Sequence, residues 1–109
     1  MALTYKVLAQ SAPAATTNTD ILTIGSGKQA VVSTVTVSNR AATSATYRIA
    51  VRPSGATLAN QHYIAYDCTV GPNDTTALTI GLTLTATDII TVYASNANLS
   101  FGIFGTEIT

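Results

Sequence analysis

Alternation of apolar and polar residues with a period of two constrains this chain more than any other feature. The segment 29–38 shows it most clearly. One parity of that segment holds Val31, Val35 and Val37, with Ser33 interrupting. The other parity holds Val32, Thr34, Thr36 and Ser38. Because successive side chains of a strand point to opposite faces, we expect one set to face a core and the other to face water.

Turn clusters divide the rest of the chain into segments of the same kind. Gly25-Ser26-Gly27 predicts a tight hairpin between the second and third strands, and Gly81 indicates a bulge or bend in the sixth. Strands are expected over residues 4–10, 20–24, 29–38, 45–52, 62–70, 75–84, 89–94 and 99–108. No connector is long enough for a crossover helix, so the pairing should be antiparallel. The predicted fold is an all-β antiparallel sandwich of about eight short strands, either jelly-roll-like or Ig-like.

With 109 residues, the chain is expected to form a single β-sandwich domain over residues 1–109. Residues 11–19 include Pro13 and few large side chains, which is typical of an extended arm or a connector. Residues 56–60 are consistent with one helical turn or with a loop. Residues 1–11 lack the apolar core of a signal peptide, so synthesis in a cytoplasm is the expectation.

The charge content narrows the classes of partner. Charged residues make up only 9% of the chain, against about 25% in an average soluble domain, and five basic residues balance five acidic ones. The basic residues are dispersed, which argues against binding to nucleic acid or to an anionic membrane surface. A surface with so little charge favours self-association.

The residues that most often carry catalysis are few. His62 is the only histidine and Cys68 the only cysteine. Six strand positions separate them, about 20 Å, which is too far for a dyad or a shared metal. We interpret His62 as a hydrogen-bonded residue at a strand end and Cys68 as a small, partly buried thiol.

No other pattern in the sequence selects a catalytic or cofactor site. The carboxylates are scattered, and Asp74 and Asp88 lie in turns, where Asp accepts from nearby backbone amides. Gly25-Ser26-Gly27-Lys28 lacks the spacing and the following helix of a phosphate-binding loop. We therefore expect no enzyme activity, no cofactor and no metal.

Five residues are candidates for interface or ligand contacts. Arg48 and Arg52 share a strand face, where they would bind an anion, pair across a subunit boundary or form a solvated face. His62, Tyr63 and Tyr66 lie near one loop, where aromatic rings stack on sugars. Tyr63 and Tyr66 have opposite parity, so at most one of them is expected in the core.

Several phrases carry a resemblance to a known family. They are YKVLAQSAPAATTNTDIL, QAVVSTVTVSNR, ATYRIAVRPSGATLANQHYIAYDCTV with GPNDTTALTIGLTLTATDIITVYAS, and the terminal LSFGIFGTEI. Together they cover most of the chain, which resembles small virion structural proteins of tailed bacteriophages, including phages of cyanobacteria. The resemblance implies a particle component made in the host cytoplasm and displayed on the virion, without transferring any functional residue.

Two functions from different classes follow as hypotheses. The first is a structural subunit, most simply a capsid decoration or cement protein, whose partners are other copies of itself and virion proteins such as the major capsid or tail protein. The second is a tail, baseplate or fibre component that recognises glycans on the host surface through its loops.

Overall fold

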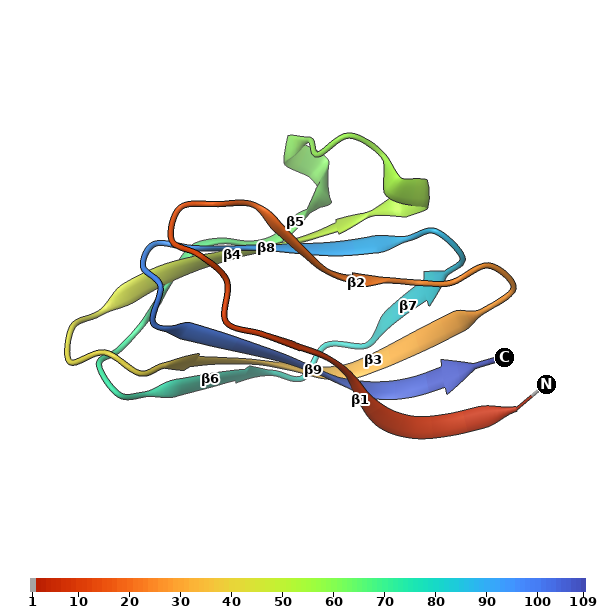
Figure 1. Ribbon diagram of the computed structural model, residues 1–109, viewed down its shortest axis with the longest axis horizontal. Helices are drawn as coiled ribbons and strands as arrows, with labels where there is room; N and C mark the ends of the chain where they lie inside the picture. Colours follow the sequence, from red (N-terminus) through yellow and green to blue (C-terminus); the bar gives the residue numbers. More distant parts are fainter. Residues whose placement is uncertain (1) are drawn as a thin grey trace.

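The computed structural model describes residues 2–109, and regular secondary structure in them is almost entirely strand (Figure 1). The strands are β1 (Leu3–Ser11), β2 (Thr19–Thr23), β3 (Gln29–Asn39), β4 (Ala45–Arg52), β5 (Tyr63–Val70), β6 (Thr75–Leu78), β7 (Leu82–Thr85), β8 (Ile89–Ala94) and β9 (Leu99–Ile108). Two single turns of 3-10 helix, η1 (Pro53–Gly55) and η2 (Asn60–His62), lie between β4 and β5. None of the described elements is a helix that could cross a bilayer.

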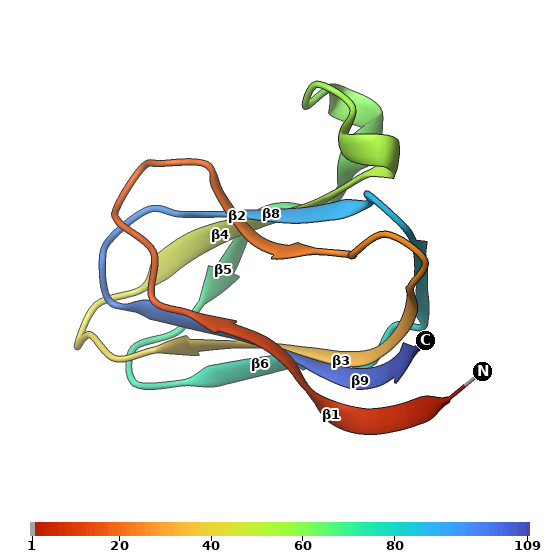
Figure 2. The ribbon, with the colours of Figure 1, turned by 45° about the vertical axis from the view of Figure 1, so that its right-hand side comes forward.

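The strands form two antiparallel sheets that pack face to face, which confirms the predicted sandwich (Figure 2). We call the sheet with order β1-β9-β3-β6 sheet A, in which β7 also pairs with β3, and the sheet with order β2-β8-β4-β5 sheet B. β6 and β7 pair with successive parts of the same edge of β3, so they are two segments of one interrupted strand. Counted in this way, eight strands follow the order of a jelly roll rather than that of an Ig domain.

The predicted hairpin at Gly25-Ser26-Gly27 is wrong in one respect. The turn is present, and Gly27 has a φ of 74°, but β2 belongs to sheet B while β3 belongs to sheet A. The glycines therefore carry the chain from one layer to the other. Residues 12–18 make the equivalent passage from β1 to β2, and the Thr16 N–H donates to the Ala94 carbonyl, 2.8 Å away.

The core lies between the two sheets and is rich in valine and isoleucine, with alanine, leucine and two aromatic rings among them. Tyr47 of sheet B and Phe101 of sheet A meet edge to face, with ring centroids 6.4 Å apart. The residues with no exposed surface include Val32, Val35, Val37, Ile49, Ile90, Leu99 and Ile103. Burying each of these side chains contributes about 1.5–3 kcal/mol, so this layer supplies most of the stability.

A line of irregularities crosses sheet A, and we call it the crease. β3 contains an extra residue at Ser33, β1 contains one at Leu8, and residues 79–81 separate β6 from β7. The bulges of β1 and β3 flank the same part of β9, near Ile103 and Phe104, and the gap at residues 79–81 lies on the other side of β3, beside its bulge. β9 itself continues through without a break. Bulges bend a sheet and increase its twist, so sheet A curves at this line (Figure 1).

Because of the bulge at the crease, the predicted faces of β3 are wrong for the residues before Ser33. Val32, Val35 and Val37 point into the core, whereas Val31 is 38% exposed. Ser33 is the unpaired residue, and its hydroxyl donates to the Phe104 carbonyl, 3.2 Å away. An extra residue reverses the parity of everything before it, so Val31 faces outward although it matches Val35 in the sequence pattern.

The crease divides sheet A into two halves. The sandwiched half runs from the crease toward the loops at residues 40–44 and 95–98, and sheet B covers its inner face. The flared half comprises Leu3–Val7 of β1, Gln29–Val32 of β3, β7 and Phe104–Ile108 of β9. It holds both ends of the described chain (Figure 1).

Candidate functional site

The five residues selected from the sequence lie on sheet B or on the excursion that follows β4. Arg48 and Arg52 lie on the outer face of β4, His62 ends η2, and Tyr63 and Tyr66 belong to β5. The structure brings Arg48, Tyr63 and Tyr66 into one cluster, and places Arg52 and His62 at the base of the excursion.

Arg48 is the centre of the first cluster. Its Nε lies 2.7 Å from Oδ1 of Asp67 and its Nη2 lies 3.3 Å from Oδ2, a bidentate ion pair. The guanidinium also lies 4.3 Å from the ring centroids of both Tyr66 and Tyr93. The hydrogen bond to Asp67 is the main cause that raises the pKa of Arg48 above its ordinary value. Arg48 is therefore already engaged within its own chain.

A bulge in β5 makes this geometry possible. Between Tyr47 and Ile49 of β4 the partner in β5 changes from Cys68 to Ala65, so Tyr66 and Asp67 together lie opposite Arg48. Asp67 has a φ of 51°, in the left-handed region that Asp tolerates better than most residues. The bulge thereby directs the ring of Tyr66 and the carboxylate of Asp67 to the same guanidinium.

A second bulge in β5, at Ile64, brings the two tyrosines together. The Tyr63 and Tyr66 rings are 4.9 Å apart and nearly perpendicular, at 89°. With Asn60 they line a shallow hollow of about 310 Å³. The expectation of opposite faces is thus wrong, because the extra residue at Ile64 restores both rings to one face. Tyr63 is half-buried and Tyr66 is 55% exposed, so neither belongs to the core.

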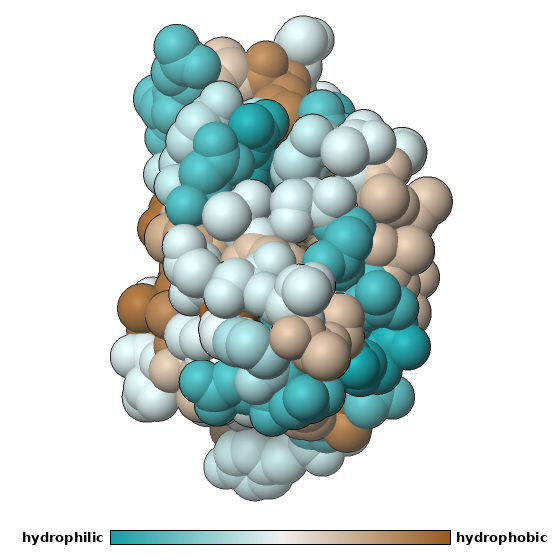
Figure 3. Space-filling model, turned by 90° about the vertical axis from the view of Figure 1, so that its left-hand side faces the viewer, coloured by the Kyte–Doolittle hydropathy of each residue, from teal (hydrophilic) through white to brown (hydrophobic). Residues whose placement is uncertain are grey.

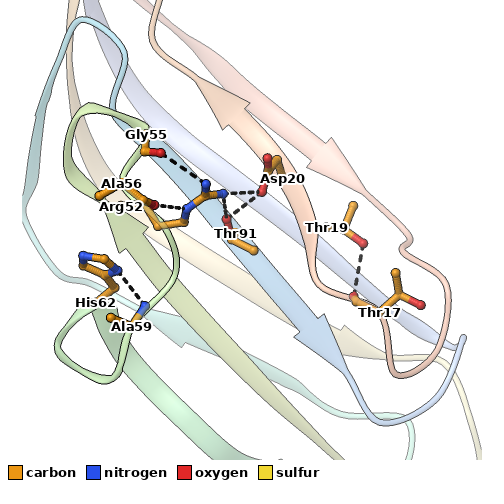
Figure 4. A network of polar contacts seen from close by, with 9 residues as sticks. All are labelled: Thr17, Thr19, Asp20, Arg52, Gly55, Ala56, Ala59, His62 and Thr91. Atoms are coloured by element: carbon orange, nitrogen blue, oxygen red, sulfur yellow. Dashed lines mark hydrogen bonds and ion pairs between the residues drawn. The ribbon is translucent and has the colours of Figure 1, made fainter.

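Arg52 holds the excursion of residues 53–62 against sheet B. Its Nε donates to the Ala56 carbonyl over 2.7 Å, and its Nη1 lies 3.0 Å from Oδ1 of Asp20 (Figure 4). The Thr91 hydroxyl donates to the same Asp20 oxygen over 2.7 Å. Arg52 thus links β2, β4, β8 and the excursion, and its guanidinium is satisfied within the chain.

His62 has a structural role in the same excursion. It is 8% exposed, and its Nδ1 accepts the Ala59 backbone N–H at 3.0 Å (Figure 4). The His62 N–H in turn donates to the Ala59 carbonyl, also at 3.0 Å, which closes the η2 turn. This is the hydrogen-bonded strand-end histidine that the sequence indicated.

Asp88 anchors the other side of the excursion. Its carboxylate accepts the Ser54 N–H at 2.8 Å and the Thr85 N–H at 2.9 Å. Asp74 likewise accepts the Thr75 N–H at 2.8 Å. Both carboxylates cap turn amides, which confirms the interpretation of these residues from the sequence.

Cys68 lies beside Tyr47 rather than beside His62. Burial is the main cause that raises the pKa of Tyr47 above its ordinary value, and the neighbouring Cys68 raises it further. Across residues 2–109, no three His, Cys, Asp or Glu side chains come close enough together to hold a metal ion.

The outer face of the flared half carries an apolar surface that sequence reasoning did not select. Tyr5 pairs across β9 with Thr106 and then with Val31, so these side chains share one face. We define the flared patch by its four most exposed apolar residues, which are Leu3 (54%), Tyr5 (81%), Val7 (48%) and Val31 (38%). The half-buried Phe104 and Ile108 lie among them on the same face. The signal was present in the alternation of Leu3, Tyr5 and Val7, but sequence alone did not show that no layer covers them.

The opposite end of the sandwich differs in character. The loop end, seen from the left side of Figure 1, presents mostly hydrophilic and near-neutral residues (Figure 3). On the outer face of the sandwiched half, Thr36 and Ser38 take the positions that apolar residues hold in the flared patch. The apolar exposure of sheet A is therefore concentrated beyond the crease.

Comparison of the chain with family models, with curated proteins and with solved structures finds no match.

Proposed function

We propose that this protein is a non-enzymatic structural subunit of a bacteriophage virion, which works by associating with copies of itself and with other virion proteins. The observation that carries the proposal is the flared patch. Monomeric proteins rarely leave large contiguous apolar surfaces open, and such surfaces mark sites of protein association. The resemblance of the chain to virion proteins of tailed phages supports the place of action.

The electrostatics of the chain support the same function. Its five basic and five acidic residues cancel, and the four ion pairs of the described residues join four of the basic residues to three of the acidic ones within the chain. The other three charged residues, Arg40, Asp74 and Asp88, form hydrogen bonds within the chain. A neighbour that covers such a surface does not have to bury an unpaired charge, which would be costly. A decoration or cement protein on the capsid, in contact with the major capsid protein, fits these properties best.

Light scattering combined with binding to particles tests the proposal. We expect the purified protein to form a defined oligomer, or to attach to phage particles that lack it. The double variant Tyr5→Ser and Val7→Ser should lose this association. The variant Ile64→Ser, which changes an apolar residue on β5 about as exposed as Val7 (42% against 48%), should retain it. A protein that stays monomeric at high concentration and does not bind particles would show that the proposal is wrong.

The hollow beside Tyr63 and Tyr66 favours a second candidate, a glycan-recognising tail, baseplate or fibre component. Two aromatic rings and the exposed amide of Asn60 are the groups that stack on sugar rings and bond to their hydroxyls. A glycan array probed with the assembled protein tests this. Binding that Tyr66→Ala removes and Tyr5→Ala leaves intact would support it, whereas an array without hits would contradict it.

A further inference from the structure

β1 leaves one of its edges open. Sheet A has the order β1-β9-β3-β6, so among the described strands β1 pairs with β9 alone. Ala2 and Thr109 exchange two backbone hydrogen bonds, each 2.9 Å long, which fixes the direction in which alternate residues point. The N–H and C=O groups of Thr4 and Lys6 therefore face β9, and those of Leu3, Tyr5 and Val7 face the open edge.

This edge has few of the features that protect natural edge strands. Residues 3–7 contain no proline, and Lys6 is their only charged residue. Lys6 alternates with Tyr5 and so lies on the other face of β1. There its Nζ is 3.6 Å from Oε1 of Glu107, which offsets its charge. The open backbone groups of β1 thus lie between two faces. One face carries the apolar side chains of Leu3, Tyr5 and Val7, and the other carries Lys6, whose charge is paired with Glu107.

We infer that the open edge of β1 pairs with β1 of a second copy of this chain, antiparallel, with Tyr5 on the two-fold axis. This inference rests on the proposed function and specifies its interface. In this register Tyr5 lies opposite Tyr5 of the second copy, and Leu3 lies opposite Val7. All of these residues direct their N–H and C=O groups to the shared edge, so each pair is hydrogen-bonded. The two copies of sheet A then form one continuous sheet.

Charge and the crease select this register over its neighbours. If the two-fold axis moved by one residue toward the crease, Lys6 would lie directly opposite Lys6 of the second copy. Like charges in that position are destabilising. With Tyr5 on the axis, Lys6 lies opposite Thr4. The bulge at Leu8 ends the regular part of β1 directly after Val7. A register centred on Tyr5 pairs the whole regular segment 3–7.

The same register joins the two flared patches. Leu3, Tyr5 and Val7 share one face with Val31, and a two-fold axis through Tyr5 continues that face into its counterpart on the second copy. The apolar pattern around Tyr5 is nearly symmetric, with Leu3 on one side and Val7 on the other. Such self-complementarity is what an isologous dimer requires.

Single cysteines at the edge test the register. In a background with Cys68→Ala, we expect Tyr5→Cys to form a covalent dimer under mild oxidation, because hydrogen-bonded partners have Cα atoms about 5.5 Å apart, within disulfide reach. Leu3→Cys alone should not, since its own counterpart lies four residues along the strand, about 13 Å away. A mixture of Leu3→Cys and Val7→Cys should give the mixed dimer. All three side chains are largely exposed, so the variants should fold.

A backbone variant separates strand pairing from side-chain contact. Tyr5→Pro removes an N–H that faces the open edge, whereas Tyr5→Ala keeps it. We expect the proline variant to lose dimerisation by light scattering and the alanine variant only to weaken it. Equal weakening in both would contradict the pairing of strands.

The outcomes distinguish this inference from the proposed function. An oligomer in which Tyr5→Cys does not cross-link overturns the edge pairing and leaves the structural function standing. A monomer that still binds phage particles does the same. A monomer that binds no particles overturns both. The cross-links expected above, in the stated combinations, establish the interface.

Discussion

The sandwiched and flared halves of sheet A share strands β1, β3 and β9 and differ on their outer faces. The inner face of β3 is buried in both halves, at Val35 in one and at Ala30 and Val32 in the other. On the outer face, the sandwiched half carries half-buried Thr36 and Ser38, whereas Val31 and Tyr5 of the flared half are 38% and 81% exposed. Alternation in sequence is similar in both halves, so alternation alone does not determine which apolar residues are buried. The second sheet and the bulges at the crease determine it.

The largest expected effect tests the two faces of β3, on either side of the crease, with the same substitution. Val35→Ala should lower the free energy of unfolding by about 2–3 kcal/mol, because it leaves a cavity in the core. Val31→Ala, on the other side of the crease, should change it by less than about 0.5 kcal/mol. Urea denaturation of both variants measures the difference. Similar losses would show that Val31 is packed like a core residue and would contradict its outward position.

Two glycines of β9 test the crease itself. A Cβ on Gly105 would overlap the Val31 carbonyl oxygen, where the backbone of β3 passes beside its bulge. Gly105→Ala should therefore cost about 2 kcal/mol, since backbone must move. A Cβ on Gly102 would meet the Phe104 ring edge and the Thr36 hydroxyl, each 2.8 Å away, and both are side chains that can turn.

Gly102→Ala is thus the matched control, and we expect it to cost about half as much. Thermal denaturation of the two variants ranks them. If Gly102→Ala were the more damaging substitution, the close approach at the bulge would not be the constraint that we describe.

The pKa of Tyr47 predicts a smaller effect, confined to alkaline solution. Burial raises this pKa above its ordinary value of 10.0 in the folded protein. The unfolded chain therefore loses the phenolic proton first as the pH rises. The contribution to stability is fully present below about pH 10 and is lost as the pH rises toward the folded pKa.

Tyr47→Phe removes this ionisation, so its urea midpoint should fall less steeply above pH 10 than that of the unaltered protein. Measurements at pH 7 serve as the reference for the packing cost of the substitution. If the urea midpoints of the two proteins fell in parallel above pH 10, the alkaline loss of stability would not come from Tyr47.

The smallest effect belongs to the outer face of sheet B, which contrasts with the flared patch in being charged but internally paired. Arg48→Lys should lower stability slightly, because lysine cannot reproduce the bidentate contact with Asp67 or the stacking between Tyr66 and Tyr93. A double-mutant cycle with Arg48→Ala and Asp67→Ala should give a favourable coupling that weakens in high salt. If the effects of the two substitutions were additive, the ion pair between Arg48 and Asp67 would contribute nothing to stability.

Most of the fold could be predicted from local pattern. Turn clusters placed the strand ends within a residue or two, and Gly81 correctly indicated an irregularity in the strand that became β6 and β7. Besides the hairpin at residues 25–27, two errors concerned the faces of strands, those of Val31 and Val32 and those of Tyr63 and Tyr66. Both arise from bulges, at Ser33 and Ile64, because one extra residue reverses the parity on which the prediction depended.

The candidate site was less accessible to sequence reasoning. The tyrosines and arginines were selected, but their internal partners Asp67, Asp20 and Tyr93 come from distant positions that only the fold brings together. For β3, the spacing of Ala30, Val32, Val35 and Val37 does contain the shift, since one interval of three stands among intervals of two. The flared patch needed the topology, because exposure depends on whether another layer lies opposite.

The crease has a consequence for how the protein fluctuates. β9 is the one strand of sheet A that crosses this line without an irregularity, and the hydrogen-bond ladders that it forms with β1 and with β3 are both interrupted there. Amide protons of Thr4 and Lys6, which bond to β9 at the exposed edge of the flared half, should therefore exchange with solvent through local opening, while those of Val35 and Ile103 exchange only when the whole domain unfolds. The β1 edge, where a second copy would pair, is then the part of the sheet that opens most readily, while the sandwiched half stays closed.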